Sequence, residues 1–167
     1  NFLSMALDAL GIAGQALTGE ALGAEDGQRA RKLTAIMARW GAWVGVGMGV
    51  VLVAIHRLLP LAFSTQDDVR LAIAAGLLVV ALLQPLSGPV FVLDGVLIGA
   101  GDGKWLSGAQ VVMLLAYLPM IIGVYLAQPS GPMAVVWLWV AWAGFMAVRG
   151  LLLWWRARGD AWMRLGA

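Results

Sequence analysis

Cysteine is absent from the 167 residues, and histidine occurs once, as His56. The chain therefore cannot form a disulfide framework, a thiolate metal site or a metal site built from several histidines. Charge is also scarce, since Asp, Glu, Lys and Arg make up 12% of the residues and the net charge is +2. Soluble domains average about 25% charged residues. A composition so poor in charge excludes a disordered segment and a nucleic-acid-binding domain.

Apolar residues, by contrast, are in large excess. They form 62% of the chain, and the mean hydropathy is +0.87. A soluble domain of this size leaves much of its surface exposed, so it could not hide this much apolar area from water. Most of the chain must therefore face lipid, which excludes a soluble enzyme.

The long apolar runs predict helices. In lipid the backbone must satisfy its own hydrogen bonds, so apolar segments of about 20 residues cross the bilayer as helices. Runs such as LAIAAGLLVVALL do not alternate as the strands of a membrane barrel do. We expect an all-α, polytopic membrane protein with about five spans, at approximately residues 2–22, 33–59, 69–100, 109–126 and 133–155.

The charged connectors predict the orientation of the spans. Lys and Arg gather in residues 23–32, 101–108 and 156–167, whereas residues 61–68 and 127–132 contain neither. The positive-inside rule places the basic connectors in the cytoplasm. We therefore expect a multi-pass protein of the cell (inner) membrane with a cytoplasmic C-terminus.

The start of the chain suggests a piece of a longer protein. It opens on Asn1 and enters an apolar run without the basic segment of a signal peptide. Five spans that end inside must also begin outside. We expect a further helix to precede this segment.

Two acidic residues stand inside predicted spans, where an ionisable side chain marks a candidate site. Asp8 lies in the first span, and Asp94 lies in the third, within VFVLDGVLIGAG. Each carboxylate could bind a proton, Na⁺ or an organic cation, or could instead accept a hydrogen bond between helices. Gln15 and Gln84 are the polar candidates that accompany them. Arg149, deep in the last span, is expected to snorkel or to face a carboxylate.

The third span also carries helix-breaking residues. Pro85, Gly88 and Pro89 lie within QPLSGP, and each proline removes a backbone donor. We expect these residues to kink and interrupt the helix, so that its unpaired carbonyls line a cavity, as at transporter binding sites. Glycines four residues apart in the second span, Gly41, Gly45 and Gly49, predict close helix packing instead.

A short repeat ends two of the spans. Gly23-Ala24-Glu25-Asp26-Gly27 follows the first span, and Gly99-Ala100-Gly101-Asp102-Gly103 follows the third. Glycine ends helices by adopting a left-handed conformation. The repeated helix end indicates a bundle built by duplication.

These segments resemble a known family. ALDALGIAGQALTGEALGAEDGQRAR resembles the eighth helix and following loop of MATE (multidrug and toxic compound extrusion) transporters, and most closely the DinF-like branch. QPLSGPVFVLDGVLIGAGDGKWL resembles the tenth helix of that family. The two segments cover about a third of the chain. The resemblance implies that residues 1–167 form part of the C-terminal lobe, half of a two-lobe bundle, and lack the N-terminal lobe of the same chain.

The resemblance also implies a function. Family members export small organic cations or amphipathic drugs in exchange for H⁺ or Na⁺, by alternating access between the lobes. Asp94 matches the tenth-helix aspartate of NorM-like members, which takes part in cation coupling, so Na⁺ could bind there. In DinF-like members the protonated aspartate is assigned to the N-terminal lobe. The first loop reads GAED where the family usually has GAGD.

Two other functions remain open at this stage. A lipid-linked flippase of the same superfamily should carry several basic residues in its cavity, whereas this chain offers Arg149 alone. A non-transporting membrane scaffold or subunit should tolerate Asn at Asp8 and Asp94. An enzyme is not expected, because no nucleophile–base pair or metal cluster is present, and no cofactor beyond the coupling ion is implied.

Overall fold

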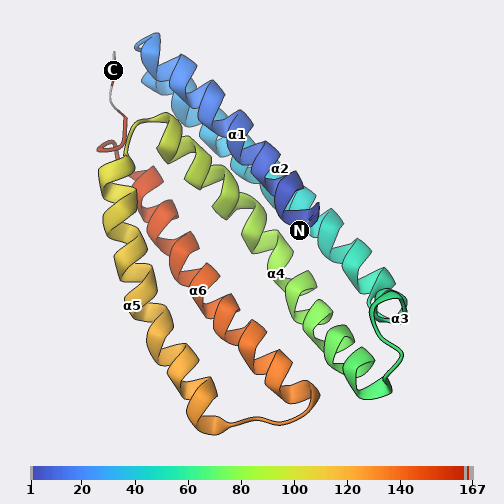
Figure 1. Ribbon diagram of the computed structural model, residues 1–167. Helices are drawn as coiled ribbons and strands as arrows, with labels where there is room; N and C mark the ends of the chain where they lie inside the picture. The colour runs from blue at the N-terminus through green and yellow to red at the C-terminus, as the bar shows by residue number, and fades with distance from the viewer. Residues whose placement is uncertain (1, 164, 166–167) are drawn as a thin grey trace.

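The computed structural model describes residues 2–163 and 165, and its regular structure there is entirely helical (Figure 1). Five long helices form, as the hydropathy predicts, together with one short helix. They are α1 (Phe2–Gly23), α2 (Gly27–Ile55), α3 (Leu59–Phe63), α4 (Asp67–Gly99), α5 (Gly103–Ala127) and α6 (Pro132–Arg158).

Four of the helices, α2, α4, α5 and α6, are long and apolar enough to cross a membrane. With 22 residues, α1 also has sufficient length at about 1.5 Å per residue. It is not among the four, and its sequence includes Asp8, Gln15, Thr18 and Glu20. The polytopic helical fold is confirmed.

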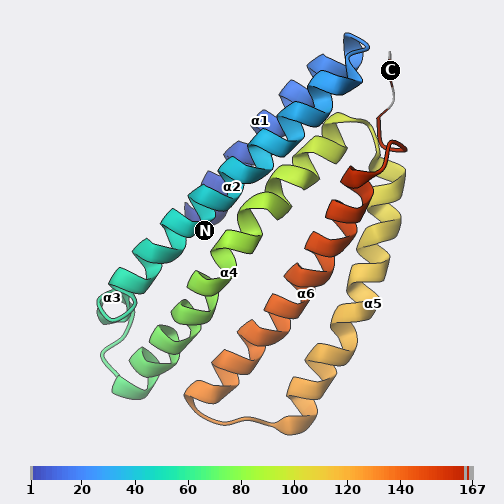
Figure 2. The same cartoon turned by 180° about the vertical axis from the view of Figure 1, so that it is seen from behind.

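The centre of the arrangement is α4, which contacts every other helix. Figures 1 and 2 show α1 and α2 on one side of α4, and α5 and α6 on the other. The α1–α2 turn, the α4–α5 turn and the C-terminal segment lie at one end of the bundle. We call this the basic end, because it carries the basic connectors that the sequence analysis grouped on one side.

The expected interruption of the third span is wrong, because α4 is helical without a break through Pro85 and Pro89. The kink at these prolines stays a prediction. A proline at position 85 leaves the carbonyl of Ala81 without its usual helical donor. That carbonyl faces Gly49 of α2, where an added Cβ would lie 2.6 Å from its oxygen. Close Cα–H···O contacts between helices offset part of the missing bond. The neighbouring helix thus covers the proline site, and no gap opens in α4.

The close packing expected from glycine is confirmed. Gly41 lies so near α4 that an added Cβ would stand 2.8 Å from the carbonyl carbon and oxygen of Gly88. On α1, a Cβ at Gly11 would stand 3.0 Å from the carbonyl oxygen of Phe91. Small residues bring α1 and α2 into backbone contact with α4.

The second and fourth expected spans have different bounds. The second was expected to reach residue 59, but α2 ends at Ile55, and a turn at residues 56–58 leads into α3. Pro60 lies in the first turn of α3, where its missing N–H is tolerated. The fourth span was expected from residue 109, but α5 begins at Gly103 because the polar first turn is helical too.

The two repeated turns have the same backbone structure. The amide of Asp26 donates to the Ala21 carbonyl at 2.9 Å, and that of Asp102 donates to the Leu97 carbonyl at 3.0 Å. This is the Schellman bond of a left-handed helix end. The left-handed residues are Gly101, with φ 73°, and Glu25, with φ 59°. Glycine fills that position in one turn only, so Glu25 carries backbone strain that Gly101 does not.

The tryptophans near the basic end behave differently from one another. Trp154 and Trp155 are 46% and 67% exposed, whereas Trp162 is fully buried. Its ring belongs to the hydrophobic core at the basic end.

Candidate functional site

An ion pair joins α4 and α6 one to two turns from the end of α4 at the basic end of the bundle. The guanidinium of Arg149 contacts the carboxylate of Asp94, and each side chain is 19% exposed. Arg149 therefore faces a carboxylate, which was one of its two expected arrangements, and does not snorkel to the membrane surface. Two opposite charges are held together inside a region where either alone would be costly.

Small residues on α6 bring this pair together. Gly150, next to Arg149, packs on the face of α4 that includes Leu86 and Val90, and a Cβ there would stand 3.1 Å from Val90 Cγ2. Val90 and Asp94 are four residues apart, so they occupy one face of α4. The close approach at Gly150 therefore sets Asp94 against Arg149.

Arg149 retains a donor that has no partner in the described structure. Its Nε is buried and makes no hydrogen bond, although Nη2 donates to Asp94. A guanidinium carries five donors, and an unsatisfied buried donor is destabilising by about 1–3 kcal/mol. The ion pair thus leaves hydrogen-bonding capacity for a further acceptor.

Gln84 lies away from this pair. It is 7% exposed and its Oε1 has no hydrogen-bond partner. Its Cβ would stand 3.7 Å from a Cβ at Gly49, so Gln84 belongs to the α2 side of α4, whereas Asp94 faces α6. The two are ten residues apart, about 15 Å along the helix. The structure does not bring Gln84 and Asp94 into one site.

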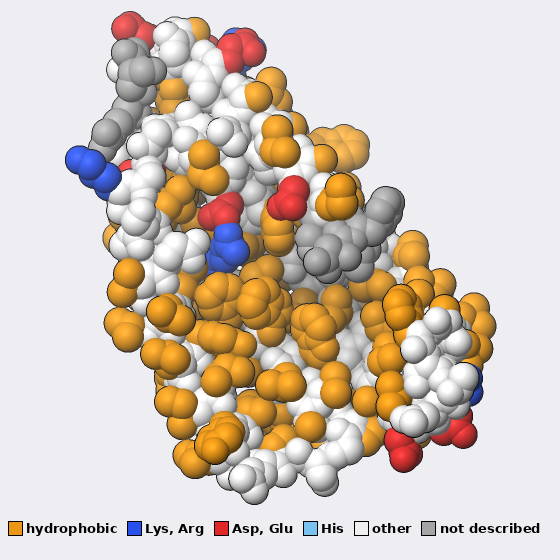
Figure 3. Space-filling model, viewed as in Figure 1, with side chains coloured by type: hydrophobic (Ala, Val, Ile, Leu, Met, Phe, Trp, Pro, Cys, Tyr) orange, Lys and Arg blue, Asp and Glu red, His pale blue; other side chains and the backbone are white. Residues whose placement is uncertain are grey.

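Asp8 and Gln15 are both exposed on α1. Asp8 lies one turn before Gly11, which packs on Phe91 of α4. No hydrogen bond joins Asp8 to Asp94 in the described structure. Figure 3 shows acidic and basic side chains grouped on this face above a broad hydrophobic area.

A second ion pair, which the sequence did not reveal, involves Asp102 of the repeated helix end. Asp102 is 3% exposed and accepts two hydrogen bonds from Arg156, at 2.6 Å from Nε and 3.0 Å from Nη2. The same guanidinium lies 5.3 Å from the centre of the Trp105 ring. Both charges were expected at the basic end, but only packing shows that they meet. This pair fastens the α4–α5 turn to α6.

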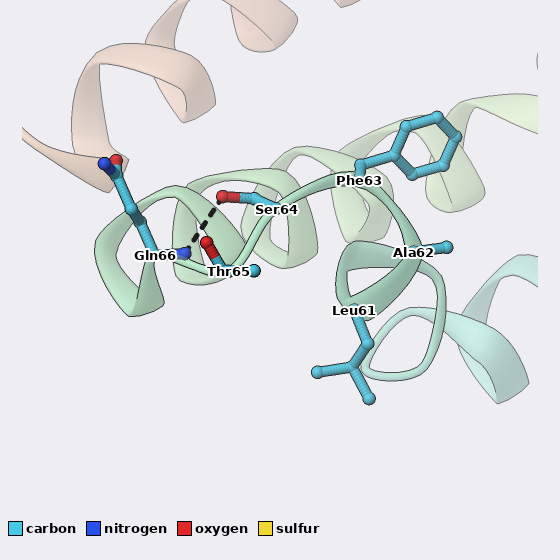
Figure 4. Close-up of a pocket in the computed structure, with 6 residues that line it drawn as sticks. All are labelled: Leu61, Ala62, Phe63, Ser64, Thr65 and Gln66. Atoms are coloured by element: carbon cyan, nitrogen blue, oxygen red, sulfur yellow. Dashed lines mark hydrogen bonds between the residues drawn. The ribbon is translucent and has the colours of Figure 1, made fainter.

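Two hollows lie away from both pairs. The one in Figure 4 has a volume of about 400 Å³ and is lined by six consecutive residues, 61–66, from the end of α3 and the connection that follows it. Within it, the hydroxyl of Ser64 accepts from the amide of Gln66 at 3.1 Å. The other, of about 580 Å³, lies between α5 and α6 and is lined by apolar residues such as Met120 and Val140. Neither is lined by a residue that the sequence analysis proposed.

Comparison with known proteins identifies similar sequences. Residues 1–126 match the family model described as MatE. The chain is 28% identical over 153 residues to Protein DETOXIFICATION 42 of Arabidopsis thaliana, and the aligned region covers 92% of this chain and 29% of that protein. It is 26% identical over 148 residues to Protein DETOXIFICATION 43 of the same plant, covering 89% of this chain and 27% of that protein. The chain thus spans less than a third of the length of these relatives. No solved structure matches it.

Proposed function

Since the chain belongs to the MatE family, we propose that it is part of the C-terminal lobe of an efflux antiporter of the DinF-like branch. The complete transporter would export small organic cations or amphipathic drugs in exchange for H⁺ or Na⁺, by alternating access. The names of its plant relatives, which include the word detoxification, support an export role. The partners of this segment would be the N-terminal lobe and the lipid bilayer of the cell (inner) membrane, with the basic end in the cytoplasm.

The observation that carries this proposal is the Asp94–Arg149 ion pair between α4 and α6. A carboxylate carries one negative charge, so in this partly buried position it can neutralise only one cation. Arg149, a proton, Na⁺ and an organic cation therefore compete for Asp94. Such exclusive occupation is the basis of exchange, because the arrival of one cation requires the departure of another.

Arg149 would act as the internal competitor. When Asp94 is ionised, the guanidinium neutralises it and holds α6 on α4. When Asp94 takes a proton, Na⁺ or a substrate cation, Arg149 loses its partner, and leaving a charge unpaired in such a site costs about 3–5 kcal/mol. That difference is large enough to move α6 relative to α4 and to bias a two-state equilibrium.

The decisive experiment compares variants in the complete transporter. Asp94→Asn copies the neutral carboxyl group, so we expect membrane insertion to survive and ion-driven efflux to be lost. Arg149→Gln removes the competitor, so Asp94 should hold a substrate cation more tightly and efflux should slow at the release step. Arg158→Gln, an exposed change on the same helix, is the matched control and should leave efflux unchanged.

Efflux measured against pH separates this proposal from its alternatives. Normal efflux with an unchanged pH profile in Asp94→Asn would remove Asp94 from coupling and transfer that role to the N-terminal lobe. The scaffold alternative would be favoured if the unmodified protein transported nothing and both Asp8→Asn and Asp94→Asn left the function of the protein unchanged. Movement of a phosphate-bearing lipid that depends on Arg149 would favour the flippase.

A further inference from the structure

The segment that follows α6 folds back onto the basic end of the bundle. We call residues 159–163 the C-terminal strap. Its Trp162 is fully buried, and the indole Nε1 donates to the carbonyl of Ala157 at 3.1 Å. The amide of Met163 donates to the carbonyl of Asp160 at 3.0 Å. The strap is thus a defined turn that inserts one large aromatic side chain.

Trp162 belongs to a core to which both sides of the bundle contribute. Burial of a large aromatic ring supplies more apolar contact than any other single side chain. The other buried residues of this core include Ala21 and Leu22 of α1, Ala30 of α2, Val96 and Leu97 of α4, Ala100 of the α4–α5 turn, Leu106 of α5 and Leu153 of α6.

Polar contacts tie the strap to the same two sides. The carboxylate of Asp160 pairs with Arg31 of α2, and the Ala161 carbonyl accepts from Nη2 of Arg156 at 3.3 Å. That guanidinium also holds Asp102 in the α4–α5 turn. On the α1–α2 side, a Cβ at Gly27 would stand 3.8 Å from the sulfur of Met163.

The position of the strap suggests its role. The helix pair α1–α2 packs on one side of α4 and the pair α5–α6 packs on the other. At the basic end the strap reaches from α6 to the α1–α2 turn, beside the α4–α5 turn. It therefore crosses between the two helix pairs at the end where both repeated turns lie.

We propose that the C-terminal strap is a fastening device that holds the two helix pairs together at the basic end, so that this segment moves as one rigid body. Trp162 supplies the main attachment. The Asp160–Arg31 pair is largely exposed, at 77% and 46%, so it contributes little energy and sets the position of the strap instead. Release of the strap would let the α1–α2 pair move separately from the α5–α6 pair. This role does not depend on which ion or substrate is transported.

The test measures the separation of the two helix pairs directly. In the complete protein, on a background without other reactive cysteines, nitroxide labels are attached at Gln28→Cys in α2 and Lys104→Cys in α5, both exposed positions. Double electron–electron resonance then gives the distribution of distances between the labels. We expect Trp162→Ala to broaden this distribution clearly. Trp155→Ala removes an exposed tryptophan from the end of α6 and should leave the width unchanged.

A second pair of variants decides the matter if Trp162→Ala does not fold. Asp160→Arg sets two like charges against each other and should broaden the distribution less than Trp162→Ala. Adding Arg31→Asp to it restores an opposite pair in exchanged order and should return the original width. A folded Trp162→Ala protein with an unchanged distribution would overturn the proposal. If Trp162→Ala cannot be measured, an Asp160→Arg protein whose distance distribution keeps its original width would also overturn the proposal.

Discussion

Replacement of Gly41 by alanine tests the backbone contact on which the arrangement of α2 and α4 depends. Gly41 is buried, and a Cβ added there would lie 2.8 Å from the carbonyl carbon and oxygen of Gly88 and 3.1 Å from the nitrogen of Pro89. Ordinary contacts of a Cβ begin near 3.4 Å. All three obstructing atoms are backbone, so no side chain can rotate away.

The magnitude follows from the shift that this contact requires. To move from 2.8 Å to 3.4 Å, α2 must withdraw from α4 by about 0.6 Å, and a gap of that size forfeits about a quarter to a half of each affected dispersion contact. Forced overpacking typically costs about 1–3 kcal/mol. Gly45 and Gly49 share the interface, so their contacts loosen as well. We expect Gly41→Ala to lower the free energy of unfolding by about 1–3 kcal/mol.

Thermal unfolding of the purified protein in detergent measures this loss, and Gly47→Ala is its control. Gly47 lies in the same helix, is exposed and has nothing within 4 Å of an added Cβ. Alanine there should be neutral or stabilising by up to about 1 kcal/mol, because glycine loses more backbone conformational freedom than alanine when it enters a helix. Equal stability of Gly41→Ala and Gly47→Ala would refute the direct backbone contact between α2 and α4.

Two further predictions concern the repeated turns, and thermal unfolding checks both. Glu25→Gly should stabilise the protein by about 1–2 kcal/mol because it removes a side chain from a left-handed residue. Gly101→Ala should destabilise the protein for the same reason. If Glu25→Gly lowered the stability instead, Glu25 would carry no backbone strain. Asp102→Asn should destabilise it by about 3–5 kcal/mol because Arg156 loses its charged partner. Asp26→Asn, at the matching position, should be neutral because Asn caps helices as well as Asp; equal effects would contradict a special role for Asp102.

The candidate site was only partly predictable from sequence. Asp94 stands out in the sequence because a carboxylate in an apolar run is costly, and the possibility that Arg149 faces a carboxylate follows from its depth. Their pairing could not be derived, because they are 55 residues apart and the approach depends on Gly150. Asp8 satisfies the same sequence criterion as Asp94, yet it is exposed on α1 and is not joined to Arg149.

The proline segment shows why local rules fail inside a bundle. Pro85 and Pro89 predict a break when α4 is considered alone, since each lacks a donor. The glycines of α2 bring a second backbone against the exposed carbonyls, which the local sequence of α4 does not reveal. The helix stays continuous because its neighbour covers the place where the sequence predicts an opening.

The sequence by itself determined that most of the chain faces lipid, that it is helical, approximately where the spans lie and that basic residues gather at one end. These properties follow from composition and from periodic or local patterns, since each span must satisfy its own backbone in lipid. Tertiary structure alone decided which charges meet, whether Trp162 lies at an interface or in a core, and whether two prolines open a helix. Those outcomes depend on contacts between residues far apart in the chain, and at the two prolines they depend on the close approach of the α2 backbone at glycine.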